Sequence, residues 1–136
     1  MAITGLDHFA ILSSDAERTT RFYTDIVGLR VGFRPSDLSF PGIWLYAEET
    51  PIVHVVFERE IPSFTTGAVD HLSFRASGSA DDMAALLTER GIEFSKRTLV
   101  RTGITQIFCR DPDNVGVEFN YPPAAKAGTP ESPANA

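Results

Sequence analysis

The chain has 136 residues, of which 43% are hydrophobic and 22% are charged, a composition typical of one soluble globular domain. Twelve Lys and Arg against 18 Asp and Glu give a net charge of −6, which disfavours binding to nucleic-acid phosphates. The sequence contains no apolar run long enough to span a bilayer, no signal-peptide pattern at its start, and one cysteine, Cys109, which excludes an intrachain disulfide. We therefore expect a cytoplasmic protein with neither a nucleic-acid nor a membrane partner.

In chain order, the hydrophobic pattern predicts strand, helix and three strands, twice over. The first set covers Leu6–Leu12, Asp15–Val27, Leu29–Arg34, Gly42–Ala47 and Ile52–Glu58. The second set covers Asp70–Ala76, Ala80–Arg90, Glu93–Thr98, Gln106–Cys109 and Gly116–Tyr121. Residues 122–136 hold four of the nine prolines and no apolar periodicity, so they are expected to form a flexible tail.

The two sets are related by an offset of 63 residues. Gly5–Ile11 aligns with Ala68–Phe74, and both segments contain an Asp-His pair within an apolar run. Gly28 aligns with Gly91, and each follows a predicted helix. The repeat predicts an α+β domain over residues 1–121, built from tandem βαβββ modules of about residues 1–66 and 67–121 that form a concave mixed sheet.

Four side chains that can bind a metal occupy repeat-related positions in the predicted strands. His8 and His71 open the first strand of each module, while His54 and Glu118 lie 46 and 47 residues further on. We expect these four side chains to converge, because equivalent positions of a duplicated module can meet near an approximate two-fold axis. Imidazole and carboxylate donors suit Fe, Mn, Ni, Zn or Co as divalent ions, and two His with one carboxylate leave coordination sites open for a substrate.

The two Asp-His pairs, together with the closing stretch Asp111–Glu118, resemble the vicinal oxygen chelate superfamily over residues 4–121. That superfamily includes glyoxalases, epimerases, fosfomycin-resistance proteins, extradiol dioxygenases and bleomycin-resistance binding proteins. The resemblance implies a glyoxalase-like fold and a homodimer. It also implies a metal triad of His8, His71 and Glu118, with His54 at the place where glyoxalases and epimerases have a fourth ligand.

The resemblance favours a metal-dependent lyase or isomerase that acts on a small substrate chelated through vicinal oxygens. Glu118 or His54 would move a proton next to a carbonyl, and His54 could act from outside the coordination shell instead of as a ligand. Residues of the concave sheet are candidate substrate contacts: Phe33, Arg34, Trp44, Tyr46, Gln106 and Phe108.

Three alternatives remain open at this point. Extradiol dioxygenases carry a Tyr and a Gly where this chain has Phe108 and Asn114, which weakens the hypothesis of a ring-cleavage dioxygenase. A fosfomycin-type reaction would use a cationic pocket, for which the candidates are Lys96, Arg97, Arg101 and Arg110. A bleomycin-type binding protein would need no metal, so the three triad residues argue against that class.

Overall fold

A computed structural model of the chain describes residues 1, 5–58, 60, 69 and 71–123. Module 1 contains β1 (Phe9–Leu12), α1 (Ala16–Arg21), the π-helical turn η1 (Phe22–Ile26), β2 (Arg30–Gly32), β3 (Gly42–Ala47) and β4 (Thr50–Val56). Module 2 contains β5 (His71–Arg75), α2 (Ala80–Glu89), β6 (Phe94–Thr98), β7 (Thr105–Arg110) and β8 (Gly116–Tyr121). The order of elements is the predicted one, and His8 lies just before β1 instead of within it.

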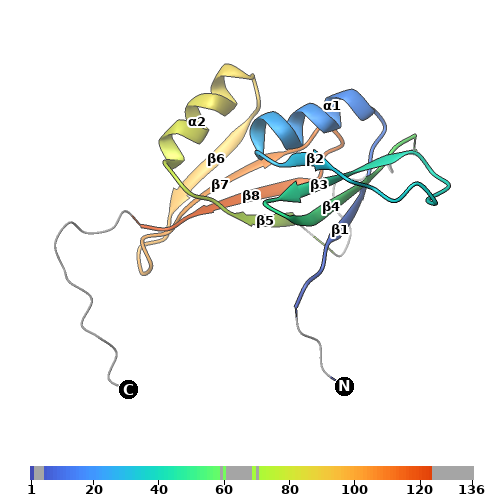
Figure 1. The fold of residues 1–136 in the computed structure, drawn as a ribbon. Helices are drawn as coiled ribbons and strands as arrows, with labels where there is room; N and C mark the ends of the chain where they lie inside the picture. Colours follow the sequence, from blue (N-terminus) through green and yellow to red (C-terminus); the bar gives the residue numbers. More distant parts are fainter. Residues whose placement is uncertain (2–4, 59, 61–68, 70, 124–136) are drawn as a thin grey trace.

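Each module forms its own four-stranded mixed sheet. The strand orders are β1-β4-β3-β2 and β5-β8-β7-β6, with the first strand parallel to the last and the other neighbours antiparallel. Figure 1 shows the two sheets next to each other, with α1 and α2 on the same side of them. The predicted α+β class is confirmed, and the eight strands of the described residues divide into two four-stranded sheets.

The strand registers show which residues of the two modules are structurally equivalent. His54 lies opposite Ala10 on β1 and Trp44 on β3, whereas Glu118 lies opposite Ser73 on β5 and Phe108 on β7. His8 and His71 each precede that β1 or β5 position by two residues. Because side chains alternate along a strand, both modules present the predicted donors on corresponding faces.

Capping explains where the two helices begin and end. The Asp15 carboxylate accepts from the Arg18 amide at the start of α1, and the Ser79 hydroxyl accepts from the Asp81 and Asp82 amides at the start of α2. Gly28 and Gly91 follow the helices at φ of 82° and 66°, a backbone conformation that glycine adopts without a Cβ penalty.

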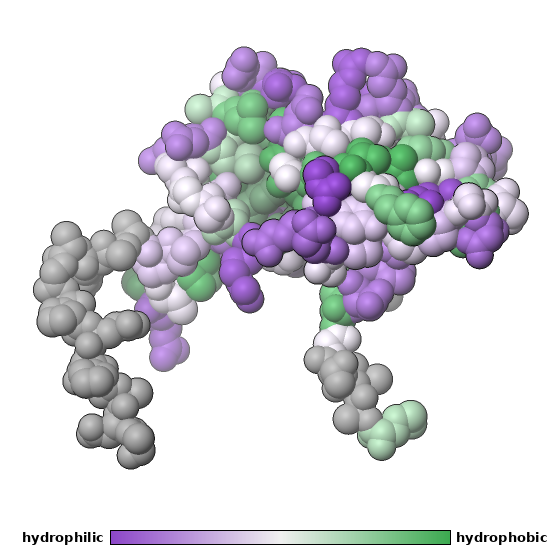
Figure 2. Space-filling view, viewed as in Figure 1, coloured by the Kyte–Doolittle hydropathy of each residue, from purple (hydrophilic) through white to green (hydrophobic). Residues whose placement is uncertain are grey.

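The hydrophobic core lies between the helices and the sheets and is shared by both modules. Its fully buried side chains come from η1, α2 and the central strands: Tyr23, Leu45, Val53, Val55, Leu87, Ile107 and Val117. In Figure 2, hydrophilic residues cover the outer surfaces of the helices and hydrophobic residues lie between and below them.

A buried polar contact joins the two modules inside this core. The hydroxyl of Tyr23 on η1 donates to Asp111 Oδ2 at 3.1 Å, and Asp111 Oδ1 accepts from the amides of Asp113 and Val115 at 2.9 Å each. Burial raises the pKa of both the Tyr23 hydroxyl and the Asp111 carboxyl, because it disfavours their charged forms. The loop that contains Asp111 is therefore anchored to η1 of the other module.

Apart from Pro122 and Pro123, the predicted tail lies outside the described residues, as does the predicted boundary between the modules at residues 66 and 67. None of the helices in the described ranges is long and apolar enough to cross a membrane.

Candidate functional site

Module 2 places an imidazole and a carboxylate together on one face of its sheet. His71 Nε2 lies 2.9 Å from Glu118 Oε2, with the two side chains on the neighbouring strands β5 and β8. Glu118 is only 4% exposed, and a carboxylate buried to this extent needs a charged or hydrogen-bonding partner. His71 and Glu118, two of the four predicted donors, therefore contact each other within one module.

A polar network holds the other oxygen of Glu118. The Gln106 side-chain amide on β7 donates to Glu118 Oε1 and, at 3.0 Å, to Asn120 Oδ1. Arg97 Nε on β6 donates to the Gln106 carbonyl oxygen at 2.8 Å. Gln106, predicted as a substrate contact, thus binds a predicted metal ligand, a role that its position on the strand alone did not indicate.

Module 1 places two imidazoles in an aromatic stack. The ring of His54 lies between those of His8 and Trp44, at centroid distances of 3.7 and 4.1 Å. Burial, and then the charge of His8, lower the pKa of His54 and so favour its neutral form, which is the form that binds metals. His54 Nε2 is buried and has no hydrogen-bond partner among the described residues.

Asp7 fixes the orientation of His8. Its Oδ2 lies 2.6 Å from His8 Nδ1, so that in the neutral ring Nδ1 carries the proton and Nε2 keeps its lone pair. In the sequence, an Asp directly precedes both His8 and His71, and this repeated pair could have indicated the contact. The second Asp, Asp70, lies outside the described residues.

The expected convergence of all four donors does not occur within a single chain. Among the residues that the structure describes, no group of three or more His, Cys, Asp and Glu side chains is placed to hold a metal ion. The donors instead form two pairs, His8 with His54 and His71 with Glu118, because each pair belongs to a separate sheet. Each pair is half of the predicted donor set.

The remaining substrate candidates lie in two different environments. Trp44 and Phe108 contact the donor pairs, since Trp44 stacks on His54 and Phe108 meets the His71 ring edge-on at 5.0 Å. Phe33 and Arg34 follow β2 in the chain, and Arg34 donates to the carbonyl of Phe40. The Tyr46 hydroxyl donates to the Phe33 carbonyl at 2.8 Å, so these three residues stabilise a loop.

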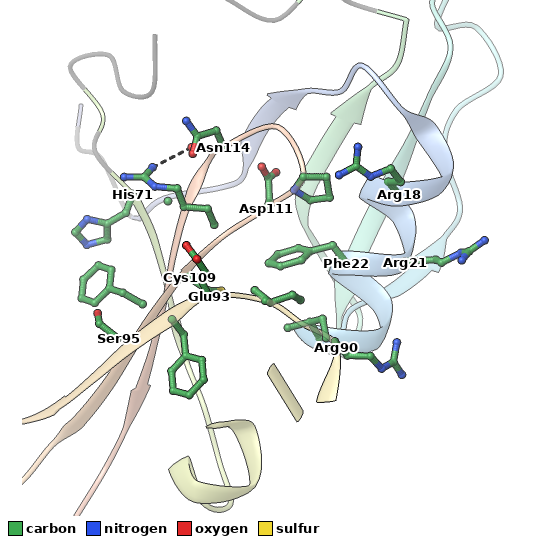
Figure 3. A pocket seen from close by; sticks show the side chains of 17 residues that line it. Arg18, Arg21, Phe22, His71, Arg90, Glu93, Ser95, Cys109, Asp111 and Asn114 are labelled. Atoms are coloured by element: carbon green, nitrogen blue, oxygen red, sulfur yellow. Dashed lines mark hydrogen bonds between the residues drawn. The ribbon is translucent and has the colours of Figure 1, made fainter. Parts of the chain in front are cut away.

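A cavity of about 920 Å³ lies where α1 and η1 of module 1 approach β6 and β7 of module 2 (Figure 3). His71 and Phe108 are among its lining residues, as are four arginines: Arg18, Arg21, Arg90 and Arg110. Arg21 points away from the cavity and pairs with Glu17, while Arg90 pairs with Asp25 at 3.3 Å. Arg21 and Arg90 therefore each have an acidic partner. Of the predicted cationic candidates, Lys96 pairs with Asp81.

Comparisons with known proteins agree with this architecture. The family model described as Glyoxalase/Bleomycin resistance protein/Dioxygenase superfamily matches residues 5–119. A virulence protein of Salmonella typhimurium is 27% identical over 128 residues, which cover 88% of this chain and 85% of that protein.

Two solved structures share the fold. A fosfomycin-resistance protein variant from Listeria monocytogenes, complexed with Mn(II) and 1S,2S-dihydroxypropylphosphonic acid, has a TM-score of 0.72 at 17% identity, covering 90% of this chain and 95% of that one. An antibiotic-binding protein from a Streptomyces species has a TM-score of 0.66 at 23% identity, covering 90% of this chain and 98% of that one.

Proposed function

Because the chain belongs to the Glyoxalase/Bleomycin resistance protein/Dioxygenase superfamily, we propose that it is a divalent-metal-dependent, glyoxalase-like lyase or isomerase whose small substrate chelates through vicinal oxygens. The family and the fold by themselves support a broader statement, that the chain is a vicinal oxygen chelate enzyme or binding protein.

The observation that carries the proposal is the His71–Glu118 pair. A buried carboxylate that faces an imidazole nitrogen at 2.9 Å provides two ligands of the kind that first-row divalent ions prefer. The other module fits the same chemistry, because His54 has a buried nitrogen without a partner among the described residues and Asp7 sets the His8 tautomer. His8, His71 and Glu118 would hold the metal, with His54 as a fourth ligand or as an acid–base group.

We infer that the two donor pairs meet across a homodimer. Module 1 of one chain would face module 2 of the other, so that each of two equivalent sites would receive His8 and His54 from one copy and His71 and Glu118 from its partner. The unpaired edges of β1 and β5 in the described chain are compatible with such a contact.

Different residues of the chain would have different roles in the proposed reaction. The metal, when bound, would stabilise negative charge that develops on the two chelating oxygens. Glu118 or His54 would take a proton from the substrate carbon and return it, while the Trp44 and Phe108 rings would exclude water from the reacting centre.

Metal analysis and a mixing experiment test this proposal. Chain purified without added metal should take up about one Mn²⁺ or Zn²⁺ per site, and His8→Ala or Glu118→Gln should each lower the affinity strongly. Glu49→Gln, which removes an exposed carboxylate, is the control for net charge.

If the sites span two copies, mixing the His8→Ala and Glu118→Gln chains restores one intact site in each mixed dimer. Sites confined to one chain would gain nothing from mixing, which would refute the inferred dimer. Absence of metal uptake by the wild-type chain would refute the enzyme proposal itself.

The role of His54 can be tested separately. If His54 is a ligand, His54→Ala lowers metal affinity; if it is an acid–base group, affinity persists and turnover falls. A variant with unchanged affinity and turnover would eliminate both roles.

A metal-free binding protein is the second candidate, favoured by the stack of His8, His54 and Trp44 on the sheet of module 1. Such a surface would take a planar aromatic molecule by stacking. Quenching of the fluorescence of Trp44, the only tryptophan, by planar ligands in the presence of a chelator would support this function. Quenching that required added metal would favour the enzyme.

A further inference from the structure

A hydrogen-bond network runs across all four strands of the module 2 sheet and ends on the buried carboxylate of Glu118. From β5 to β6, the Asn120 amide donates to Ser73 Oγ at 2.6 Å, Gln106 donates to Asn120 Oδ1 at 3.0 Å, and Arg97 Nε donates to Gln106 at 2.8 Å. Gln106 is the member that also contacts Glu118.

The Arg97 contact determines which end of the Gln106 amide faces Glu118. An arginine Nε–H can only donate, so the Gln106 atom 2.8 Å from it must be the carbonyl oxygen. The amide nitrogen then points at two acceptors, Glu118 Oε1 and Asn120 Oδ1, and both of its hydrogens are used. A flipped amide would place two acceptor oxygens against each other and leave the Arg97 Nε–H facing a donor.

We infer that Gln106 is a positioning residue for Glu118 and that the hydrogen bond from Arg97 holds the Gln106 amide in the required orientation. With Oε1 held by Gln106, the carboxylate is fixed so that Oε2 faces His71 Nε2 at 2.9 Å. Groups that orient a metal ligand in this way typically contribute 10- to 100-fold to metal affinity.

Among the described residues of module 1, no equivalent of this network occurs at the corresponding position. His54 has Trp44 as its cross-strand neighbour where Glu118 has Phe108, and its ring is fixed by stacking. Arg97 adds a second contact of its own, since its guanidinium carbon lies 5.8 Å from the centre of the Phe108 ring. The network therefore serves the one carboxylate among the four predicted donors.

This inference rests on the proposed function, and Mn²⁺ affinity measured by calorimetry on the full-length protein tests it. Gln106→Met, which keeps the side-chain length but cannot donate, should weaken Mn²⁺ binding by about 10- to 100-fold. Gln106→Asn, one methylene too short to reach Glu118, should weaken it similarly while keeping a polar group in the sheet, in case the Met variant folds poorly.

A double-mutant cycle tests whether Arg97 acts by orienting the Gln106 amide or only through its charge. Arg97→Met should weaken Mn²⁺ binding in the wild-type background and have no further effect in the Gln106→Met background, because the amide it orients is gone. Lys96→Met removes the same charge from the neighbouring position of β6, where the side chain pairs with Asp81, and should leave the affinity within about twofold.

Three results would overturn the inference. Wild-type affinity in both Gln106 variants would show that Glu118 needs no support, and equal effects of Arg97→Met in both backgrounds would show that its charge acts independently of the amide. In either case the proposed function stands if the wild-type chain binds Mn²⁺. A wild-type chain that takes up no metal would overturn the proposed function together with this inference.

Discussion

The contact between Tyr23 and Asp111 predicts a measurable coupling between the two modules. The Asp111 carboxylate accepts three hydrogen bonds, from the Tyr23 hydroxyl, the Asp113 amide and the Val115 amide. At about 1 kcal/mol net for each bond, Asp111→Ala should lower the free energy of unfolding by about 3 kcal/mol, and by more if the buried Tyr23 hydroxyl stays unpaired. Tyr23→Phe, which loses one of these bonds, should cost about 1–2 kcal/mol.

The double variant should cost about 1 kcal/mol less than the sum of the two single variants, because the shared bond is lost only once. Urea unfolding followed by circular dichroism measures all four proteins. Tyr46→Phe is the matched control, since that hydroxyl donates to the Phe33 carbonyl in a loop, and it should change stability by at most about 0.5 kcal/mol. Additivity within about 0.3 kcal/mol would refute the coupling.

The same carboxyl gives this contact a defined pH dependence. Burial raises the pKa of Asp111 above its value in the unfolded chain, so the native state holds the proton more tightly. The resulting contribution to stability is fully present below the unfolded pKa and is lost as pH rises through the raised folded pKa. Asp111→Asn removes it, so the stability of the wild type relative to this variant should fall as the pH rises above about 4, the ordinary pKa of an aspartate. A difference that stays constant as the pH is raised would contradict the assignment.

Three further predictions concern single positions. Gly42→Ala should destabilise the protein by about 1–3 kcal/mol in thermal unfolding, because an added Cβ would lie 2.2 Å from the Val55 carbonyl oxygen, whereas Gly5→Ala, with no atom within 4 Å, should be neutral. Cys109 is 5% exposed and burial raises its thiol pKa to about 11, so it should react with a thiol reagent only after unfolding, and rapid labelling of the native protein at pH 8 would contradict this. Ser79→Ala should cost about 1 kcal/mol in urea unfolding by removing the cap of α2, while an unchanged midpoint would mean that the cap is dispensable.

The predictable part of this structure is the part determined by short-range patterns. The strands β3 and β8 have the predicted bounds, Gly42–Ala47 and Gly116–Tyr121, because turn-forming residues lie on both sides of each apolar run. The predicted helix Asp15–Val27 occupies the right place but divides into α1 and η1. Its apolar pattern indicated a buried face and could not reveal that the backbone changes to π-type hydrogen bonding at Phe22.

Long-range contacts explain what could not be predicted. The repeat correctly paired His8 with His71 and His54 with Glu118 as equivalent positions, but equivalence does not specify which residues meet. In the structure the contacts run within modules, from His8 to His54 and from His71 to Glu118. The role of Gln106 was missed for the same reason, because a contact between Gln106 on β7 and Glu118 on the neighbouring strand β8 has no local sequence signal.

The duplicated register also explains why the two modules are not interchangeable. The same position of β4 and β8 carries an imidazole packed between aromatic rings in one module and a carboxylate held by the Gln106 amide in the other. The first environment disfavours charge and the second supplies donors to a negative group, so exchanging His54 and Glu118 would leave each in the wrong surroundings. Under the proposed pairing of module 1 with module 2, a substrate would therefore contact aromatic side chains on one side of the metal and hydrogen-bonding side chains on the other. Two copies of module 1 would lack Glu118 and two copies of module 2 would lack the stack of His8, His54 and Trp44, so a site built from unlike modules is the arrangement in which each donor keeps the environment that suits it.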